Sequence, residues 1–177
     1  MEIYYPKQHK KIVSDLLGGK FILQKNELFD TITQNNKKFY TSFFDESFGY
    51  DLKITNEYVC LISLESNEKL SKNITLFLAI LCYELDREGK NFSSEIKTSY
   101  FDIEEVKEKL LASEYKEVIL NIDEIANLHK LVQQMTDRNI TERKSENRFA
   151  FTPAVEIFFR FAEEYLKQND VEKINIS

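Results

Sequence analysis

A pair of short apolar stretches separated by a polar break, placed directly behind three short helical segments, most constrains how this chain can fold. Residues 50–54 alternate apolar and polar side chains, residues 55–57 are polar, and residues 58–62 form a second β-prone apolar run. Strict alternation over this length is typical of a strand with one buried face. The pattern predicts a β-hairpin over residues 50–62.

Three helical segments are predicted before this hairpin. The first covers residues 7–17, and residues 20–23 after it are extended; the second begins at the capping residue Asn26. The third ends at Gly49, since glycine tolerates the left-handed conformation that closes a helix. Its five aromatic residues share one face, and they are Phe39, Tyr40, Phe43, Phe44 and Phe48. Helices followed by a hairpin are typical of a winged-helix module.

The same order is predicted again in the second half of the chain. A helix over about residues 74–87 is apolar on nearly every side, so we expect it to be buried all round where the two units pack together. Asp102 and Glu105 have the spacing of a helix N-cap and its third residue, which predicts a helix over 103–112. Apolar residues then repeat at helical spacing over 122–138.

A second wing and a closing helix complete the predicted pattern. Residues 139–143 and 148–152 flank a polar turn, and Thr152 can cap a helix that has Pro153 at its first position and runs to about Gln168. The predicted fold class is mainly α with small β-hairpins (α+β), as tandem winged-helix domains plus a C-terminal helix. The expected divisions are an N-terminal domain at 1–63, a connection at 64–73, a second domain at 74–152, and a helix and tail at 153–177.

The charge distribution argues against a protein that mainly holds nucleic acid. The net charge is −6, and residues 1–63 carry eight lysines against eight acids, so the excess negative charge lies in residues 64–177. Proteins that bind nucleic acid backbone are usually basic, because neutralising phosphates supplies much of their affinity. Any contact with DNA is therefore expected to be weak and assisted by partners.

Residue types that carry catalysis are sparse and scattered. Cys60 and Cys82 sit in apolar runs and are expected to be core thiols in a reducing compartment, while His9 and His129 are isolated in sequence. There is no zinc-ligand spacing, glycine-rich phosphate loop or nucleophile elbow. The sequence predicts no catalytic, metal or cofactor site, and we expect a protein that is not an enzyme.

No signal peptide or membrane-spanning segment is recognised in the sequence. The first 17 residues contain three lysines and no long apolar stretch, and the longest apolar run, residues 76–83, is too short to span a bilayer. We therefore expect a cytoplasmic protein without a membrane partner.

Two groups of basic residues are candidates for DNA contact. Lys37 and Lys38 open the third helix, the position of the recognition helix in winged-helix DNA readers, while Arg143, Lys144 and Arg148 cluster at the second wing tip. The alternative is that hairpin tips are polar because they are exposed. Specific base reading is disfavoured because the third helix carries Phe and Tyr where Arg, Asn or Gln would be needed.

The closing helix is a candidate for contact with a partner or a second copy. Its apolar residues cover an arc of roughly 200°, wider than the stripe that one contact surface requires. The predicted contact residues are Ile157, Phe158, Phe161 and Tyr165. The alternative is a helix wedged between the two units.

Several short runs carry a resemblance to a known family. They are Leu16 to Ile22, Tyr40 and Phe44, Gly49 to Leu52, Tyr58 and Leu61, and Phe149 to Pro153. With these runs, nearly the whole chain resembles the tandem winged-helix subunits of bacterial condensins that bind the kleisin, of the MukE and MksE type.

The resemblance implies a non-catalytic, nucleoid-associated accessory subunit. Such a subunit would form a homodimer, bind a kleisin-type subunit, and regulate how an SMC-type ATPase entraps DNA in chromosome organisation or plasmid exclusion. Two alternatives remain open at this point: a stand-alone winged-helix transcription regulator, which would bind duplex DNA with sequence preference and salt dependence, and an enzyme of unrecognised type.

Overall fold

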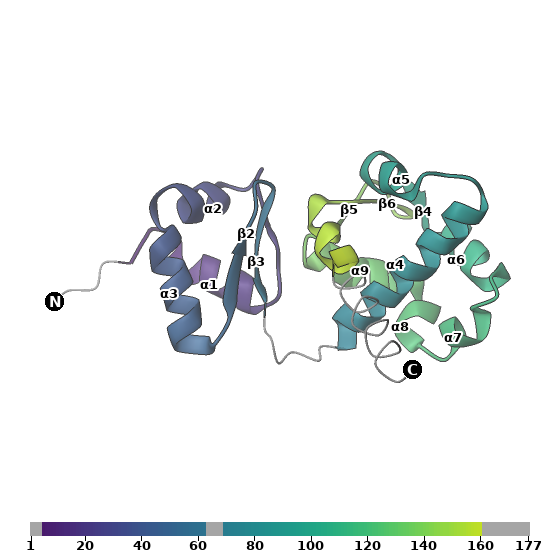
Figure 1. Ribbon diagram of the computed structural model, residues 1–177, viewed down its shortest axis with the longest axis horizontal. Coiled ribbons are helices and arrows are strands. Elements are labelled where there is room, and N and C mark those ends of the chain that lie inside the picture. Colours follow the sequence, from purple (N-terminus) through teal and green to yellow (C-terminus); the bar gives the residue numbers. More distant parts are fainter. Residues whose placement is uncertain (1–4, 63–68, 161–177) are drawn as a thin grey trace, which may run out of the picture. The chain divides into compact units, whose positions relative to one another are not determined.

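The chain divides into two compact units, each with its own small sheet (Figure 1). The computed structural model describes residues 5–62 and 69–160. Unit 1 comprises residues 1–66 with 137–140, and unit 2 comprises residues 67–136 with 141–177. Both units consist mainly of helices with a three-stranded antiparallel sheet. This confirms the predicted fold class of mainly α structure with small β-hairpins, while the finer division at 64–73 and 153 stays a prediction.

Unit 1 has the predicted order of helices, short strand and hairpin. Its elements are α1 (His9–Leu17), β1 (Ile22–Leu23), α2 (Glu27–Asp30), a π-helical turn η1 (Thr31–Asn35), α3 (Lys37–Phe48), β2 (Asp51–Ile54) and β3 (Tyr58–Ile62). The strands are ordered β1-β3-β2, and Leu52 pairs with Leu61 across the hairpin.

Local side-chain chemistry sets the ends of these elements. The Asn26 side chain accepts a hydrogen bond from the Leu28 N–H at 3.0 Å and so begins α2. Gly49 ends α3 with φ of 68°, a conformation that costs little only for glycine. In the hairpin turn, the Thr55 hydroxyl accepts a hydrogen bond from the Tyr58 N–H at 3.0 Å. The Asn26 cap and the helix end at Gly49 are local features, which explains why the sequence predicts them, whereas the Thr55 contact was not predicted.

The core of unit 1 is built by the inner faces of its helices against the sheet. Fully buried side chains come from every helix and from the central strand β3, and they are Ile12, Leu16, Leu28, Ile32, Tyr40, Phe44 and Val59. The rings of Tyr40 and Phe44 fix where α3 lies over this core, because they are the largest of these side chains.

Unit 2 contains more helical segments around a sheet of the same strand order. Its elements are α4 (Lys69–Arg87), α5 (Phe92–Thr98), β4 (Phe101–Asp102), α6 (Ile103–Ala112), α7 (Lys116–Leu120), α8 (Asp123–Ala126), α9 (Leu128–Asp137), β5 (Thr141–Arg143), β6 (Arg148–Phe151) and the 3₁₀ turn η2 (Pro153–Val155), with residues 156–160 helical. The order β4-β6-β5 repeats the order β1-β3-β2 of unit 1.

Two predicted helices differ from the observed ones. The helix expected from residue 74 already includes residues 69–73, whose polar side chains at 69 and 72 are exposed while Asn73 and Ile74 are buried. The continuous helix expected over residues 122–138 is wrong. It is interrupted at Asn127, whose side chain accepts a hydrogen bond from the Lys130 N–H at 3.2 Å and starts α9.

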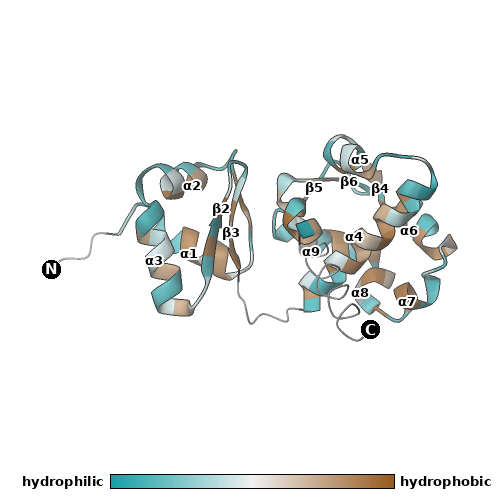
Figure 2. Cartoon of the chain, in the orientation of Figure 1, coloured by the Kyte–Doolittle hydropathy of each residue, from teal (hydrophilic) through white to brown (hydrophobic). Residues whose placement is uncertain are grey.

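The helix α4 is the main core element of unit 2, although it is not buried on all sides. Ile74, Phe77 and Leu81 are fully buried, whereas Tyr83 is exposed, so the prediction of burial all round is wrong. Figure 2 shows the hydrophobic residues of α4 interspersed with hydrophilic ones. That this helix lies where the units pack stays a prediction. No helix in the described ranges is long and apolar enough to cross a membrane.

The predicted caps of unit 2 are observed. The Asp102 carboxylate accepts hydrogen bonds from the N–H groups of Glu104 at 3.0 Å and Glu105 at 3.4 Å. The Thr152 hydroxyl accepts one from the Ala154 N–H at 3.3 Å. Each contact satisfies backbone donors at a helix start that have no partner inside the helix.

We predict that Asp102→Ala lowers the free energy of unfolding by about 1 kcal/mol, because the first turn of α6 loses its cap. Asp102→Asn is the matched control, since an asparagine side chain can accept the same hydrogen bonds. Urea denaturation followed by circular dichroism measures both variants. Equal stability of the alanine and asparagine variants would contradict the role of the cap.

Candidate interaction surfaces

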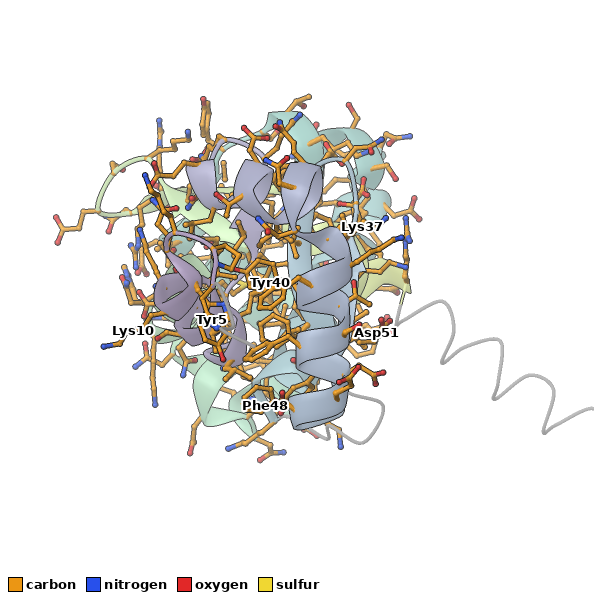
Figure 3. All side chains as sticks on the ribbon, turned by 90° about the vertical axis from the view of Figure 1, so that its left-hand side faces the viewer. Tyr5, Lys10, Lys37, Tyr40, Phe48 and Asp51 are labelled. Atoms are coloured by element: carbon orange, nitrogen blue, oxygen red, sulfur yellow. The ribbon has the colours of Figure 1, made fainter. Side chains whose placement is uncertain are left out.

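Aromatic rings gather between α1 and α3 of unit 1 and remain partly open to solvent. We call this surface the aromatic face, and it consists of Tyr5, His9, Phe39, Phe43 and Phe48. Tyr5 is 49% exposed and Phe48 is 45% exposed, while the buried rings of Tyr40 and Phe44 form the floor. Figure 3 shows Tyr5, Tyr40 and Phe48 beside α3 in the view onto this surface.

The imidazole of His9 lies at the centre of the aromatic face. It stacks on the Tyr5 ring with centroids 4.5 Å apart, and it meets the edge of Phe43 at 5.1 Å. Phe43 in turn meets Phe48 at 5.8 Å. Each such ring pair is worth about 0.5–1.5 kcal/mol beyond simple burial. The rings therefore hold α1 against α3 and also form one continuous surface.

The environment of His9 disfavours its charged form. Burial lowers the pKa of this imidazole below its usual 6.5, and its Nδ1 is buried without a hydrogen-bond partner in the described residues. The hydroxyl of Tyr40 beneath it is also buried without a partner, and burial raises the pKa of Tyr40 to about 12. Both side chains thus act at neutral pH as uncharged rings.

Lys37 lines an open pocket of about 420 Å³ between the hairpin of unit 1 and the start of α3. The pocket is lined by Gln24, Phe29, Thr33, Lys37, Ile54, Thr55 and Asn56. Lys37 and Lys38 are exposed, and neither forms an ion pair within the described residues. The structure thus leaves both predicted DNA-contact residues of unit 1 accessible.

The basic residues predicted to cluster at the wing tip of unit 2 interact with nearby residues of the same unit. Arg143 donates hydrogen bonds to the carbonyl oxygens of Glu146 and His129, the second at 3.4 Å. The Lys144 ammonium lies 2.7 Å from Glu142, which raises the pKa of Lys144.

The third member of this cluster, Arg148, lies 3.9 Å from Asp102. The wing tip therefore carries partly compensated charge, which reduces its attraction for phosphates. Contact of these three residues with DNA stays a prediction.

The residues considered for catalysis are dispersed. No group of three His, Cys, Asp or Glu that could hold a metal ion occurs among residues 5–62 and 69–160. Burial raises the pKa values of Cys60 and Cys82 to about 12, so both thiols are protonated at neutral pH. His129 lies 2.9 Å from Glu104 on α6, which is an ordinary surface pair.

A comparison with family models identifies the relationship. The model of the condensin complex protein MksE matches residues 7–164. The chain belongs to the MksE family. No individual curated protein matches at a significant level. The MksE match covers both units, so the aromatic face from His9 onward and both hairpins belong to the family region.

The predicted contact residues of the closing helix in this MksE chain have mixed placements. Ile157 and Phe158 are only 5% and 4% exposed, so a partner would reach them only if the helix moved. The neighbouring Phe159 meets Phe92 of α5 at 4.9 Å, and Glu156 pairs with Lys97 at 3.2 Å. Phe161 and Tyr165 lie outside the described residues. Partner contact through this helix stays a prediction.

Sequence reasoning missed two exposed surfaces of this MksE chain. In unit 1, Tyr5 and His9 complete the aromatic face. The sequence signal for this surface was the number of aromatic residues on α3, which exceeds what one buried stripe of a helix needs. In unit 2, Tyr83 meets Tyr115 at 5.3 Å with Arg87 above its ring, and both tyrosines are exposed. Their contact joins α4 to the start of α7 and is not visible in the sequence pattern.

We predict that His9 makes the stability of the chain depend on pH. Because its pKa is lower in the folded than in the unfolded state, its contribution is fully present above pH 6.5 and is lost as pH falls through the lowered value. His9→Phe should keep the ring contacts and remove this part of the pH dependence. Melting temperatures of the wild type and of His9→Phe, measured between pH 7.5 and 5.5, test this. An unchanged slope in His9→Phe would refute the assignment.

We predict that Phe158→Asp destabilises unit 2 by about 3–5 kcal/mol, because it removes a buried ring and buries a carboxylate. The matched variant Phe158→Leu should cost less than about 1.5 kcal/mol. Chemical denaturation measures both. If Phe158→Asp keeps the wild-type stability and loses only partner binding, this side chain belongs to an interface instead of the core.

Proposed function

We propose that this chain is the non-catalytic accessory subunit of a bacterial condensin, in which it binds a kleisin-type subunit as a homodimer. Through the kleisin it would regulate how an SMC-type ATPase entraps DNA, in chromosome organisation or plasmid exclusion. The ATP chemistry would belong to the partner. The observation that carries this proposal is the MksE family match over residues 7–164, which includes both units.

The repeated architecture supports a binding role. Each unit has one helix (unit 1) or two helices (unit 2), then a short strand, further helical segments and a hairpin, and the strand orders β1-β3-β2 and β4-β6-β5 correspond. We interpret each unit as a winged-helix module. Such modules present surfaces to partners, and this chain offers exposed aromatic residues on unit 1 for that purpose.

The charge pattern supports weak DNA contact through unit 1. Lys37 and Lys38 are exposed without ion pairs in the described residues, whereas Arg143, Lys144 and Arg148 have local partners. With a net charge of −6, the chain would lack the long-range attraction of an independent DNA binder. We therefore assign any stable hold on DNA to the assembled complex.

We predict that the tagged chain captures a kleisin-type subunit when the two are co-expressed, and captures the SMC-type ATPase only when the kleisin is present. Affinity purification followed by size-exclusion chromatography with light scattering gives the composition and stoichiometry. The control is the same purification without the kleisin. Failure to capture the kleisin, or direct capture of the ATPase without it, would contradict the proposed function.

A further inference from the structure

The aromatic face of unit 1 is an apolar surface that the described residues leave uncovered. We propose that it is the site where a second copy of this chain docks, face to face about a two-fold axis. This inference rests on the homodimer of the proposed function and assigns its surface and its contacting residues.

The composition and continuity of the aromatic face fit an interface. Single exposed apolar side chains are common on protein surfaces, but Tyr5, Phe43 and Phe48 belong to one network of ring contacts that includes two half-exposed residues. Tyrosine and phenylalanine are enriched at the centres of protein interfaces because they bury a large area with few rotatable bonds. Covering these rings would remove their remaining apolar area from water.

The two rims of the aromatic face carry opposite charges. On α3, Phe39, Phe43 and Glu46 follow each other at spacings of four and three residues and therefore share one side of the helix. On α1, Lys10 precedes the partly buried Val13 by three residues, and Figure 3 shows Lys10 at the side of the cluster away from α3. Lys10 and Glu46 are exposed, and neither forms an ion pair within the described ranges.

This charge arrangement is self-complementary. In an isologous contact the same patch of both copies forms the interface. The charge on each rim must therefore be opposite to the charge on the rim that it faces. A two-fold axis that runs along the groove between α1 and α3 places α1 of one copy over α3 of the other. Lys10 then faces Glu46 of the partner subunit, and the symmetry repeats this pair. A strongly acidic or strongly basic partner would instead meet one rim of like charge.

The test is a charge-reversal series on the full chain, with dimer dissociation constants measured by sedimentation velocity. Lys10→Glu and Glu46→Lys should each weaken the dimer roughly tenfold, because two attractive pairs become repulsive. The double variant should recover the wild-type dissociation constant. An equimolar mixture of the two single variants should form a heterodimer of near wild-type strength, because opposite charges then meet at both rims.

Two further variants separate surface effects from folding. Tyr5→Ser removes an exposed ring and should weaken the dimer several-fold while the circular dichroism spectrum stays unchanged. Lys11→Glu makes the same charge change as Lys10→Glu on the side of α1 away from Val13, and it should leave the dissociation constant unchanged. These two results together would locate the contact on the aromatic face.

Two outcomes overturn the inference, and a third overturns only the proposed function. A wild-type dimer that resists all three face variants would use another surface, and the proposed function would stand. A wild-type chain that is monomeric at every concentration excludes the second copy, and loss of kleisin capture by Tyr5→Ser would then give the aromatic face to the kleisin. Failure of kleisin capture with an intact, charge-sensitive dimer would instead reject the proposed function alone.

Discussion

Ring packing between α1 and α3 is the interaction on which the structure of unit 1 depends. The floor rings of Tyr40 and Phe44 reach the core, and the His9 imidazole connects them to the surface rings of Tyr5 and Phe43. These contacts hold α3 against α1 and over the core of unit 1. The floor rings are fully buried, whereas Tyr5 and Phe48 of the outer rings remain exposed.

The two units differ in how their surface charge is used. Exposed lysines of unit 1 such as Lys37 and Lys38 lack ion pairs within the described residues, whereas the wing tip of unit 2 is held by internal contacts of Arg143 and Lys144. A charge that already has a partner gains less from meeting a phosphate, since it must exchange one interaction for another. The two units therefore share a strand order but differ in the charge that their surfaces leave unpaired among the described residues.

The sequence predicted those features that depend on neighbours along the chain. The caps at Asn26 and Asp102 and the hairpin over residues 50–62 are set by contacts within a few residues, so their signals are local. The interruption at Asn127 was not predicted, because the apolar residues keep their helical spacing across this position although the helix itself is broken there. The place of Tyr5 and His9 in the aromatic face was missed, because their contacts with α3 join residues about thirty positions apart.

In the proposed dimer, the outer rings of unit 1 form the contact between the two copies. Hydroxyl-radical footprinting with mass spectrometry measures it most directly, because oxidation of each ring reports its exposure to solvent. The expected result is protection of Tyr5, Phe43 and Phe48 as the chain is concentrated from monomer to dimer, with Tyr100 of unit 2 oxidised equally throughout. Unchanged oxidation of the three rings in an established dimer would contradict the claim.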